Sequence, residues 1–506
     1  MTAQGLEMSL PFSLASLALR HPHIVDHGIR IDRVPAFAWL ALQAAALWPT
    51  WRWMVARTRD GSDDPLGLIA IAALAVLLWT VRRELRAAPR LGWLVVASLG
   101  TAAASVVGGA ALLSPLAAGL VAVLAWSCGL LAFLPNRTAA LPVTGLAVLA
   151  LPLLSSLQFY AGYPLRVVTA EASRWLLMPA FEVVRDGSTL SIDGRQVIVD
   201  APCSGVQMVW LGYFVACVVA LWTRRDDRGF LGRLPLVGLS VMGGNIVRNG
   251  VLVAFEGAGR PLPQWAHDAW GLVVLAVVCA VVARVMARTI GACAPDAARP
   301  ASGYVGHAGG GLLTRNRFID RVAHKAVFAF TMAASLVGGI VAVSAAPSAP
   351  LAASIAGFRE WPAEWDGALL RPMALGAVEH RFAQRFPGAI ARMTDGDNLF
   401  VMRRVDAPTR MLHPAVDCYR ALGFRIAQTR LERDARDRMW RCFSATKGRA
   451  GAQGQQEEQG QTLRVCERIV DAEGTAFTDT SAWYWAATGG MSKGPWQAVT
   501  RVRRSS

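Results

Sequence analysis

Apolar blocks about as long as a lipid bilayer is thick recur along this chain of 506 residues, and they restrict its fold more than any other feature. A helix needs about 20 consecutive apolar residues to cross the hydrocarbon core of a membrane. The sequence therefore predicts a mainly α-helical, polytopic transmembrane bundle of about eight or nine spans. The segments that approach the required length are 35–56, 65–81, 91–109, 113–134, 141–159, 204–222, 234–255, 269–286 and 326–345.

The composition agrees with a membrane protein. Charged residues make up 17% of the chain, whereas soluble proteins usually carry about 25%. The net charge of +16 could indicate nucleic-acid binding, but much of the arginine lies in loops between apolar blocks, where it is a topology signal. Because no basic module with a nucleic-acid signature accompanies it, we expect the partner to be the lipid bilayer and not a nucleic acid.

Three basic loops predict the orientation of the chain. They cover residues 82–90, 224–233 and 284–325, and the positive-inside rule assigns such loops to the cytoplasm. The N-terminal segment 1–34 is then cytoplasmic, and the C-terminus is on the outer side. We do not interpret the first residues as a cleaved signal peptide, because no basic region precedes their weakly apolar stretch.

Composition also divides the chain into parts. A transmembrane core at 35–290 is followed by a cytoplasmic linker at 291–325 and an additional span at 326–345. Residues 351–506 are charged, rich in tryptophan and free of spanning segments, so we expect a soluble α/β domain outside the membrane. The glycine- and glutamine-rich stretch 448–461 indicates a flexible loop within it.

The outer loop before the sixth span carries two local signals. An amphipathic helix over 165–177 can lie flat in the membrane interface. Alternating apolar residues around Asp193 and Gly194 predict a hairpin with a tight turn. This hairpin leads the chain directly to Cys203.

Three polar residues occupy unusual places for a membrane protein. Cys203 begins the sixth span, Arg248 lies inside the seventh, and His267 begins the eighth. Because successive spans alternate in direction, Cys203 and His267 lie near the outer surface. Arg248 precedes Phe255 by seven residues, which places it roughly 10 Å below the outer helix end, and its side chain can extend upward. We therefore expect the three groups to meet in one water-accessible pocket.

Each of these residues suits a step of acyl transfer. A thiol at a helix N-terminus has a lowered pKa, and the thiolate of Cys203 would attack a peptide carbonyl to form a thioester. His267 would exchange the proton with the thiol and protonate the leaving amine. Arg248 would stabilise the oxyanion or the thiolate. Asn245, three residues earlier on the same helix face, would orient Arg248 or donate to the oxyanion.

Simpler interpretations remain open for each residue. A cysteine in a membrane helix is most often inert, and a histidine at a helix start most often caps the helix or lies in the interface. Arg248 is harder to explain in this way, because a charge deep in a span costs about 2.5–3.5 kcal/mol on insertion scales. It could still pair with helix carbonyls or with Glu256.

Three motifs follow one another along the chain, Ala201-Pro202-Cys203-Ser204-Gly205, Asn245-x-x-Arg248 and His267-x-x-x-Gly271. This ordered set resembles the exosortase/archaeosortase family over roughly residues 30–290. The resemblance implies a cysteine transpeptidase or protease of the bacterial inner membrane, with Cys203 as nucleophile, Arg248 and His267 as its partners, and no cofactor or metal. Its substrates would be exported proteins with a PEP-CTERM sorting signal, which is a short motif, one transmembrane helix and a basic tail. The acyl acceptor, water or an amine, and the oligomeric state stay open.

The outer domain extends beyond a minimal exosortase. Residues 412–419 resemble periplasmic accessory proteins that accompany exosortases in exopolysaccharide gene clusters, which implies a role in handling substrate or acceptor. A domain that only packs on the core is the alternative. Cys418, Cys442 and Cys466 would lie in an oxidising compartment, so we expect a disulfide between two of them and one thiol left over.

Two other functions compete with the peptidase. A transporter or exopolysaccharide-export component would bind an anionic group with Arg248, although the sequence has no inverted repeat and no paired broken helices. A serine protease would use Ser204 and His267, but the Gly-x-Ser-x-Gly elbow is missing around Ser204.

Overall fold

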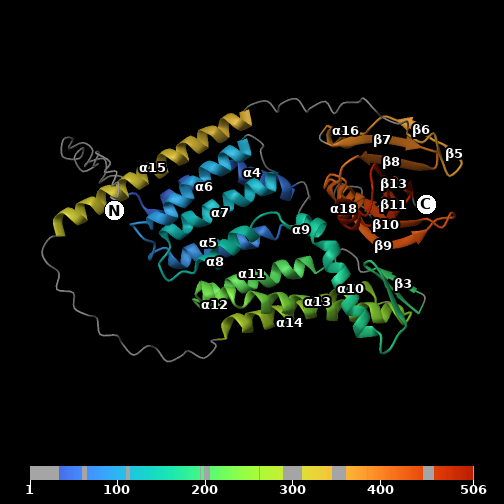
Figure 1. The fold of residues 1–506 in the computed structure, drawn as a ribbon, viewed down its shortest axis with the longest axis horizontal. Coiled ribbons are helices and arrows are strands. Elements are labelled where there is room, and N and C mark those ends of the chain that lie inside the picture. The colour runs from blue at the N-terminus through green and yellow to red at the C-terminus, as the bar shows by residue number, and fades with distance from the viewer. Residues whose placement is uncertain are drawn as a thin grey trace, which may run out of the picture.

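The computed structural model describes a helical part and a sheet-rich C-terminal part, which lie side by side (Figure 1). The described residues are 33–59, 65–109, 114–193, 195–198, 205–260, 262–288, 310–344, 361–384, 386–447 and 461–504.

Six helices form the first half of the helical part. The long helix α15 lies along α6 and α3, and α6 packs against α7 (Figure 1). Because α15 is continuous over 35 residues, the end of the predicted linker 291–325 belongs to the same helix as the ninth predicted span. The bounds are α3 (Ala36–Ala46), α4 (Trp48–Arg59), α5 (Gly67–Val81), α6 (Leu91–Gly109), α7 (Pro115–Phe133) and α15 (Gly310–Ser344).

The second half of the helical part is organised around α13. Helices α10, α11 and α14 all pack against α13, and a three-stranded hairpin unit lies at one end of it. The helices are α8 (Ala140–Leu149), α9 (Leu154–Tyr160), α10 (Gly162–Leu177), α11 (Val206–Trp222), α12 (Asp227–Leu231), α13 (Leu234–Gly257) and α14 (Gln264–Ala287). The strands are β1 (Val183–Asp186), β2 (Thr189–Ile192) and β3 (Arg195–Ile198).

Helices occupy all nine predicted span positions, but they differ in length. Within the described residues, five helices are long and apolar enough to cross a membrane, or six if the bent pair α8 and α9 counts as one span. The pair is bent by 88°, and Pro152, which cannot donate a backbone hydrogen bond, lies in the break. Helices α5 and α11 have only 15 and 17 residues. A multi-pass protein is therefore supported, while the number of eight or nine spans stays a prediction.

The basic loops gather at one end of the helical part. Arg225 donates hydrogen bonds to the main-chain carbonyls of Met286 and Arg288, each at 2.8 Å. Lys325 is buried and donates to the carbonyl of Ala87 at 3.2 Å.

The turn between α7 and α8 joins these two groups of loops. Arg137 pairs with Glu84, and the amide of Leu141 donates to Asp227 at 2.7 Å. The three loops predicted to be cytoplasmic thus share one end, as a common side of the membrane requires. Helix α14 begins, and α13 ends, at the opposite end.

The C-terminal part is built on an antiparallel sheet of eight strands. Its order is β6-β7-β8-β13-β11-β10-β9, with β12 paired to β11. All described strand pairs of this sheet are antiparallel, so the domain is α+β and the predicted α/β organisation is not confirmed. Residues 448–460, most of the predicted flexible loop, lie outside the described residues.

The bounds of these elements follow the chain. The strands are β4 (Glu364–Trp365), β5 (Ala368–Leu369), β6 (Arg371–Met373), β7 (Gly388–Thr394), β8 (Asn398–Val405), β9 (Arg425–Arg433), β10 (Met439–Lys447), β11 (Gln461–Val470), β12 (Ala476–Phe477) and β13 (Trp496–Arg504). The helices are α16 (Ala377–Ala383), α17 (Ala415–Ala421) and α18 (Thr480–Thr488).

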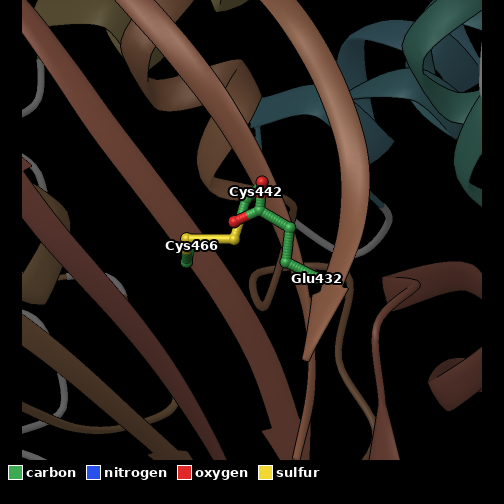
Figure 2. Close-up of side chains that lie close together, drawn as sticks. All are labelled: Glu432, Cys442 and Cys466. Carbon is green, nitrogen blue, oxygen red and sulfur yellow. A yellow bond between two sulfur atoms is a disulfide. The ribbon is translucent and has the colours of Figure 1, made fainter. Parts of the chain in front are cut away.

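A disulfide joins the neighbouring strands β10 and β11. Cys442 and Cys466 face each other across the strand pair and are bonded (Figure 2). This confirms the expectation that two of the three cysteines pair, and Cys418 is the free thiol. Glu432 lies beside the two sulfurs, but sulfurs that are bonded to each other cannot serve as thiolate ligands of a metal ion.

Helix α18 docks the sheet domain onto the helical part. The Arg166 side chain, from α10, is only 2% exposed and pairs with Asp479 at 2.6 Å. Asp479 also accepts from the amide of Ala482 and thereby caps α18, and it lies 3.4 Å from Arg441. The Asp479 carboxylate therefore both caps α18 and binds α18 to α10.

Aromatic residues and hydroxyls complete this interface. Ser481 donates to the carbonyl of Phe159, and Trp485 donates to the carbonyl of Tyr160 at 2.8 Å. The ring of Tyr484 packs edge-on against the rings of Phe159 and Tyr160. The domain is thus attached to α9 and α10, at the end opposite the basic loops.

Candidate functional site

The start of α11 fixes where the candidate nucleophile enters the fold. Cys203 and Ser204 lie outside the described residues, and the chain resumes at Gly205. Gly205 has a left-handed backbone, with φ of +77°, and a Cβ atom there would lie 2.8 Å from Cγ of Asn245. Only glycine satisfies both conditions without strain. The backbone two residues after Cys203 therefore lies directly against the Asn245 side chain.

Asn245 is held between three helices. It is fully buried on α13, and its Nδ2 donates to Oγ1 of Thr169 on α10 at 3.1 Å. One turn later, Nδ2 of Asn249 donates to the main-chain carbonyl of Asn245 at 2.9 Å. The amide of Asn245 thus has a defined orientation where α10, α11 and α13 meet.

Thr169 was not among the residues predicted from the sequence. The buried side of α10 includes Arg166, Thr169 and Ser173, so the helix turns a polar stripe toward its neighbours. The spacing of three and four residues between these polar side chains is the signal that could have identified Thr169. The sequence analysis predicted this helix and interpreted it as one that can lie flat in the membrane interface.

The Arg248 side chain packs against α14 at Gly271. A Cβ atom at Gly271 would lie 3.1 Å from Nε of Arg248. Nε1 of Trp270 donates to the main-chain carbonyl of Arg248 at 3.3 Å. The guanidinium therefore lies over the backbone of α14, and Gly271 of the predicted motif makes room for it.

His267 lies one turn before Gly271 on the same face of α14. Its side chain is 33% exposed, and its Nδ1 lies 3.5 Å from Oδ1 of Asp268. Glu256, at the end of α13, is close enough to interact with His267 electrostatically. The sequence analysis offered Glu256 as a partner for Arg248, and the structure places it near His267.

The structure thus brings Asn245, Arg248 and His267 to adjoining faces of α13 and α14, near the end opposite the basic loops. A groove of about 610 Å³ lies elsewhere, between α11 and α14, and is lined by Trp222 and Arg284 at the basic end. Its walls are mainly apolar and hold neither a cysteine nor a histidine. We therefore place the candidate site at Asn245, Arg248 and His267 and not at this groove.

The predicted hairpin covers this end of α13. Strands β2 and β3 pair from Ile192 to Arg195 across a two-residue turn, as the sequence predicted, and Asp193 has a φ of +48°. A Cβ atom at Gly257 would lie 2.6 Å from Cγ2 of Ile192, so the hairpin rests closely on the helix.

Comparison with known proteins gives one match. A family model described as transmembrane exosortase matches residues 32–284, which is about half of the chain. This range contains all five residues proposed for the site and ends before α15 and the antiparallel sheet. Neither a curated protein nor a solved structure matches the chain.

Proposed function

Because the chain belongs to the transmembrane exosortase family, we propose that it is a membrane cysteine transpeptidase or protease that cleaves a C-terminal sorting signal of exported proteins. One observation carries the proposal further than family membership. Gly205, which follows Cys203 by two residues, packs on Asn245, and Asn245 lies one turn from Arg248. Two residues of chain reach at most about 7 Å, which supports a nucleophile close to this part of α13.

The reaction would proceed through a thioester. The thiolate of Cys203 attacks the carbonyl of the scissile peptide bond, and His267 protonates the amine that leaves. Arg248, lying over α14, stabilises the charge on the oxyanion. Asn245 supports the constellation through Thr169, and Ser204 has only a supporting role. Water or an amine then releases the acyl group.

The arrangement of the helices suits a substrate of the PEP-CTERM kind. Such a substrate has a short motif, one transmembrane helix and a basic tail, and its helix would cross the same bilayer as α13 and α14. If the basic tail of the substrate lies in the cytoplasm with the basic loops, the short motif of the substrate reaches the opposite end of the bundle. His267 lies there, in the first turn of α14. The enzyme would accordingly reside in the bacterial inner membrane, with the sheet domain in the periplasm.

A processing assay tests this proposal. A membrane-anchored reporter carrying the sorting signal should be cut by the native chain, and Cys203→Ala and Arg248→Ala should each abolish cutting while the protein still accumulates in the membrane. Ser204→Ala should have a milder effect. Cutting that survives Cys203→Ala but is lost in Ser204→Ala would replace the cysteine mechanism with a serine mechanism.

A further inference from the structure

The sheet domain holds a second thiol beside an imidazole. Sγ of Cys418, on α17, lies 3.0 Å from Nε2 of His413. Nδ1 of the same ring lies 3.0 Å from the main-chain oxygen of Met411. A carbonyl oxygen only accepts hydrogen bonds, so the hydrogen-bond network assigns the ring proton to Nδ1. Nε2 is then the acceptor of the thiol hydrogen, which is the arrangement of a nucleophile and its base.

Contacts from several elements hold this pair in place. The ring of Phe382 packs edge-on against the imidazole with 5.3 Å between centroids. Arg403 donates to the main-chain carbonyl of His413 at 3.0 Å. Glu467 accepts from the amide of Ala415 at 2.7 Å and so fixes the start of α17. Both Cys418 and His413 keep part of their surface exposed.

Three arginines act on the pair at the boundary with the helical part, and the nearby carboxylates of Asp417 and Glu467 act on the thiol. Arg403, Arg410 and Arg57 all act electrostatically on His413, and Arg57 comes from α4. Arg57 and Arg410 both donate to the hydroxyl of Ser155, each at 2.9 Å. Guanidinium groups that converge in this way attract a negatively charged ligand.

Burial keeps the pair neutral at rest. Burial first, and then Arg403, lower the pKa of His413 to about 4, while burial raises the pKa of the Cys418 thiol. Arg403 lowers the pKa of the thiol as well, so the guanidinium groups attract an anionic substrate but do not by themselves move the proton from sulfur to the ring.

We propose that Cys418 and His413 form an acyl-accepting site for thioesters that carry a negative charge. Nε2 takes the thiol proton while the sulfur bonds to the carbonyl carbon, and the carbon–sulfur bond of the donor then breaks. The departing thiolate takes the proton back from the imidazolium, so no oxidant or further reactant is needed. Thioesters fit because the exchange replaces one carbon–sulfur bond with another. The site goes beyond the proposed function, since the step needs no contribution from Cys203.

The test uses the full-length protein in detergent with Cys203→Ala, which separates this site from the proposed peptidase. The probes are the benzyl thioesters of succinylglycine, which is anionic, and of acetylglycine, which is neutral. Mass spectrometry should find the succinylglycyl group on Cys418, released by hydroxylamine and added faster than the acetylglycyl group. His413→Asn should slow the reaction on the order of 100-fold, as expected for loss of a general base.

Controls distinguish the base from the fold. His413→Asn keeps a side-chain N–H that can donate to Met411 and removes Nε2 together with the rest of the ring. His380→Asn makes the same change at an exposed histidine of the domain and should react like the parent. Retention of the Cys442–Cys466 disulfide reports folding. Equal rates with and without His413, equal rates for the two probes, or labelling of Cys418 no faster than the free thiol of Cys128 would each overturn the proposal.

Discussion

At the scale of single residues, two glycines decide how closely the candidate site can pack. Gly205 and Gly271 each bring a backbone against the side chain of a site residue, Asn245 in one case and Arg248 in the other. Both glycines stand in the motifs that the sequence singled out. The motifs contain both glycines, but the sequence does not show why glycine is needed there, because the close approach of two helices depends on the tertiary structure.

Gly271→Ala tests the approach of Arg248 to α14. The added Cβ would lie 3.1 Å from Nε, so the guanidinium has to shift, and we expect processing to fall at least several-fold without loss of the protein. Gly243→Ala is the matched control, because a Cβ atom at Gly243 on α13 meets nothing within 4 Å. Equal processing rates of the two variants would show that this packing is irrelevant to the site.

Thr169→Val tests the support of Asn245. Valine has nearly the same shape but cannot accept a hydrogen bond, and an unsatisfied buried amide costs about 1–3 kcal/mol. We expect reduced processing and a lower thermal midpoint, both restored largely by Thr169→Ser, which keeps the hydroxyl. If the valine and serine variants behave alike in both measurements, the 3.1 Å contact has no role in the site.

At the scale of elements, local signals predicted more than long-range ones. The hairpin around Asp193 and the helix over 165–177 were predicted from adjacent residues, and β2, β3 and α10 are found there. The antiparallel pairing of the C-terminal strands depends on contacts between distant residues. Local signals therefore predicted helix positions but not helix lengths, and they did not predict the strand order of the C-terminal sheet.

The contact between α10 and α18 should depend on pH. Burial alone would raise the pKa of the Asp479 carboxyl, but Arg166 and Arg441 hold it below its ordinary value. A lowered pKa means that this stabilisation is full above about pH 4 and is lost as the pH falls through the lowered value. Protection of α10 and α18 against hydrogen exchange, corrected for the intrinsic exchange rate, should therefore fall as the pH drops below about 4.

Asp479→Asn removes the charge at any pH and should accelerate that exchange already at pH 7. Asp406→Asn, at an exposed aspartate of the same domain, is the control and should leave the exchange of α10 unchanged. Exchange in the Asp479 variant that matches the native chain at pH 7 would mean that the ion pair does not hold the domain in place.

At the scale of the whole molecule, the two ends of the helical part carry different features. The basic loops share one end, and the sheet domain is attached at the other. If the positive-inside rule holds for this chain, alkaline phosphatase fused after Ser506 should be active and the same fusion in the 224–233 loop should be inactive. If only the loop fusion is active, the orientation is the reverse of the predicted one, and the candidate site lies on the cytoplasmic side.

The central claim is that Cys203 carries the acyl group of a cleaved sorting signal. Purified enzyme would be mixed with a substrate protein, quenched in acid and digested, and the mass of the peptide containing Cys203 would be measured with and without hydroxylamine. The account predicts a substrate-derived thioester on that peptide, removed by hydroxylamine and formed much more slowly when His267→Ala removes the group that protonates the leaving amine. Continued processing with no adduct on Cys203 under any quench time would contradict it.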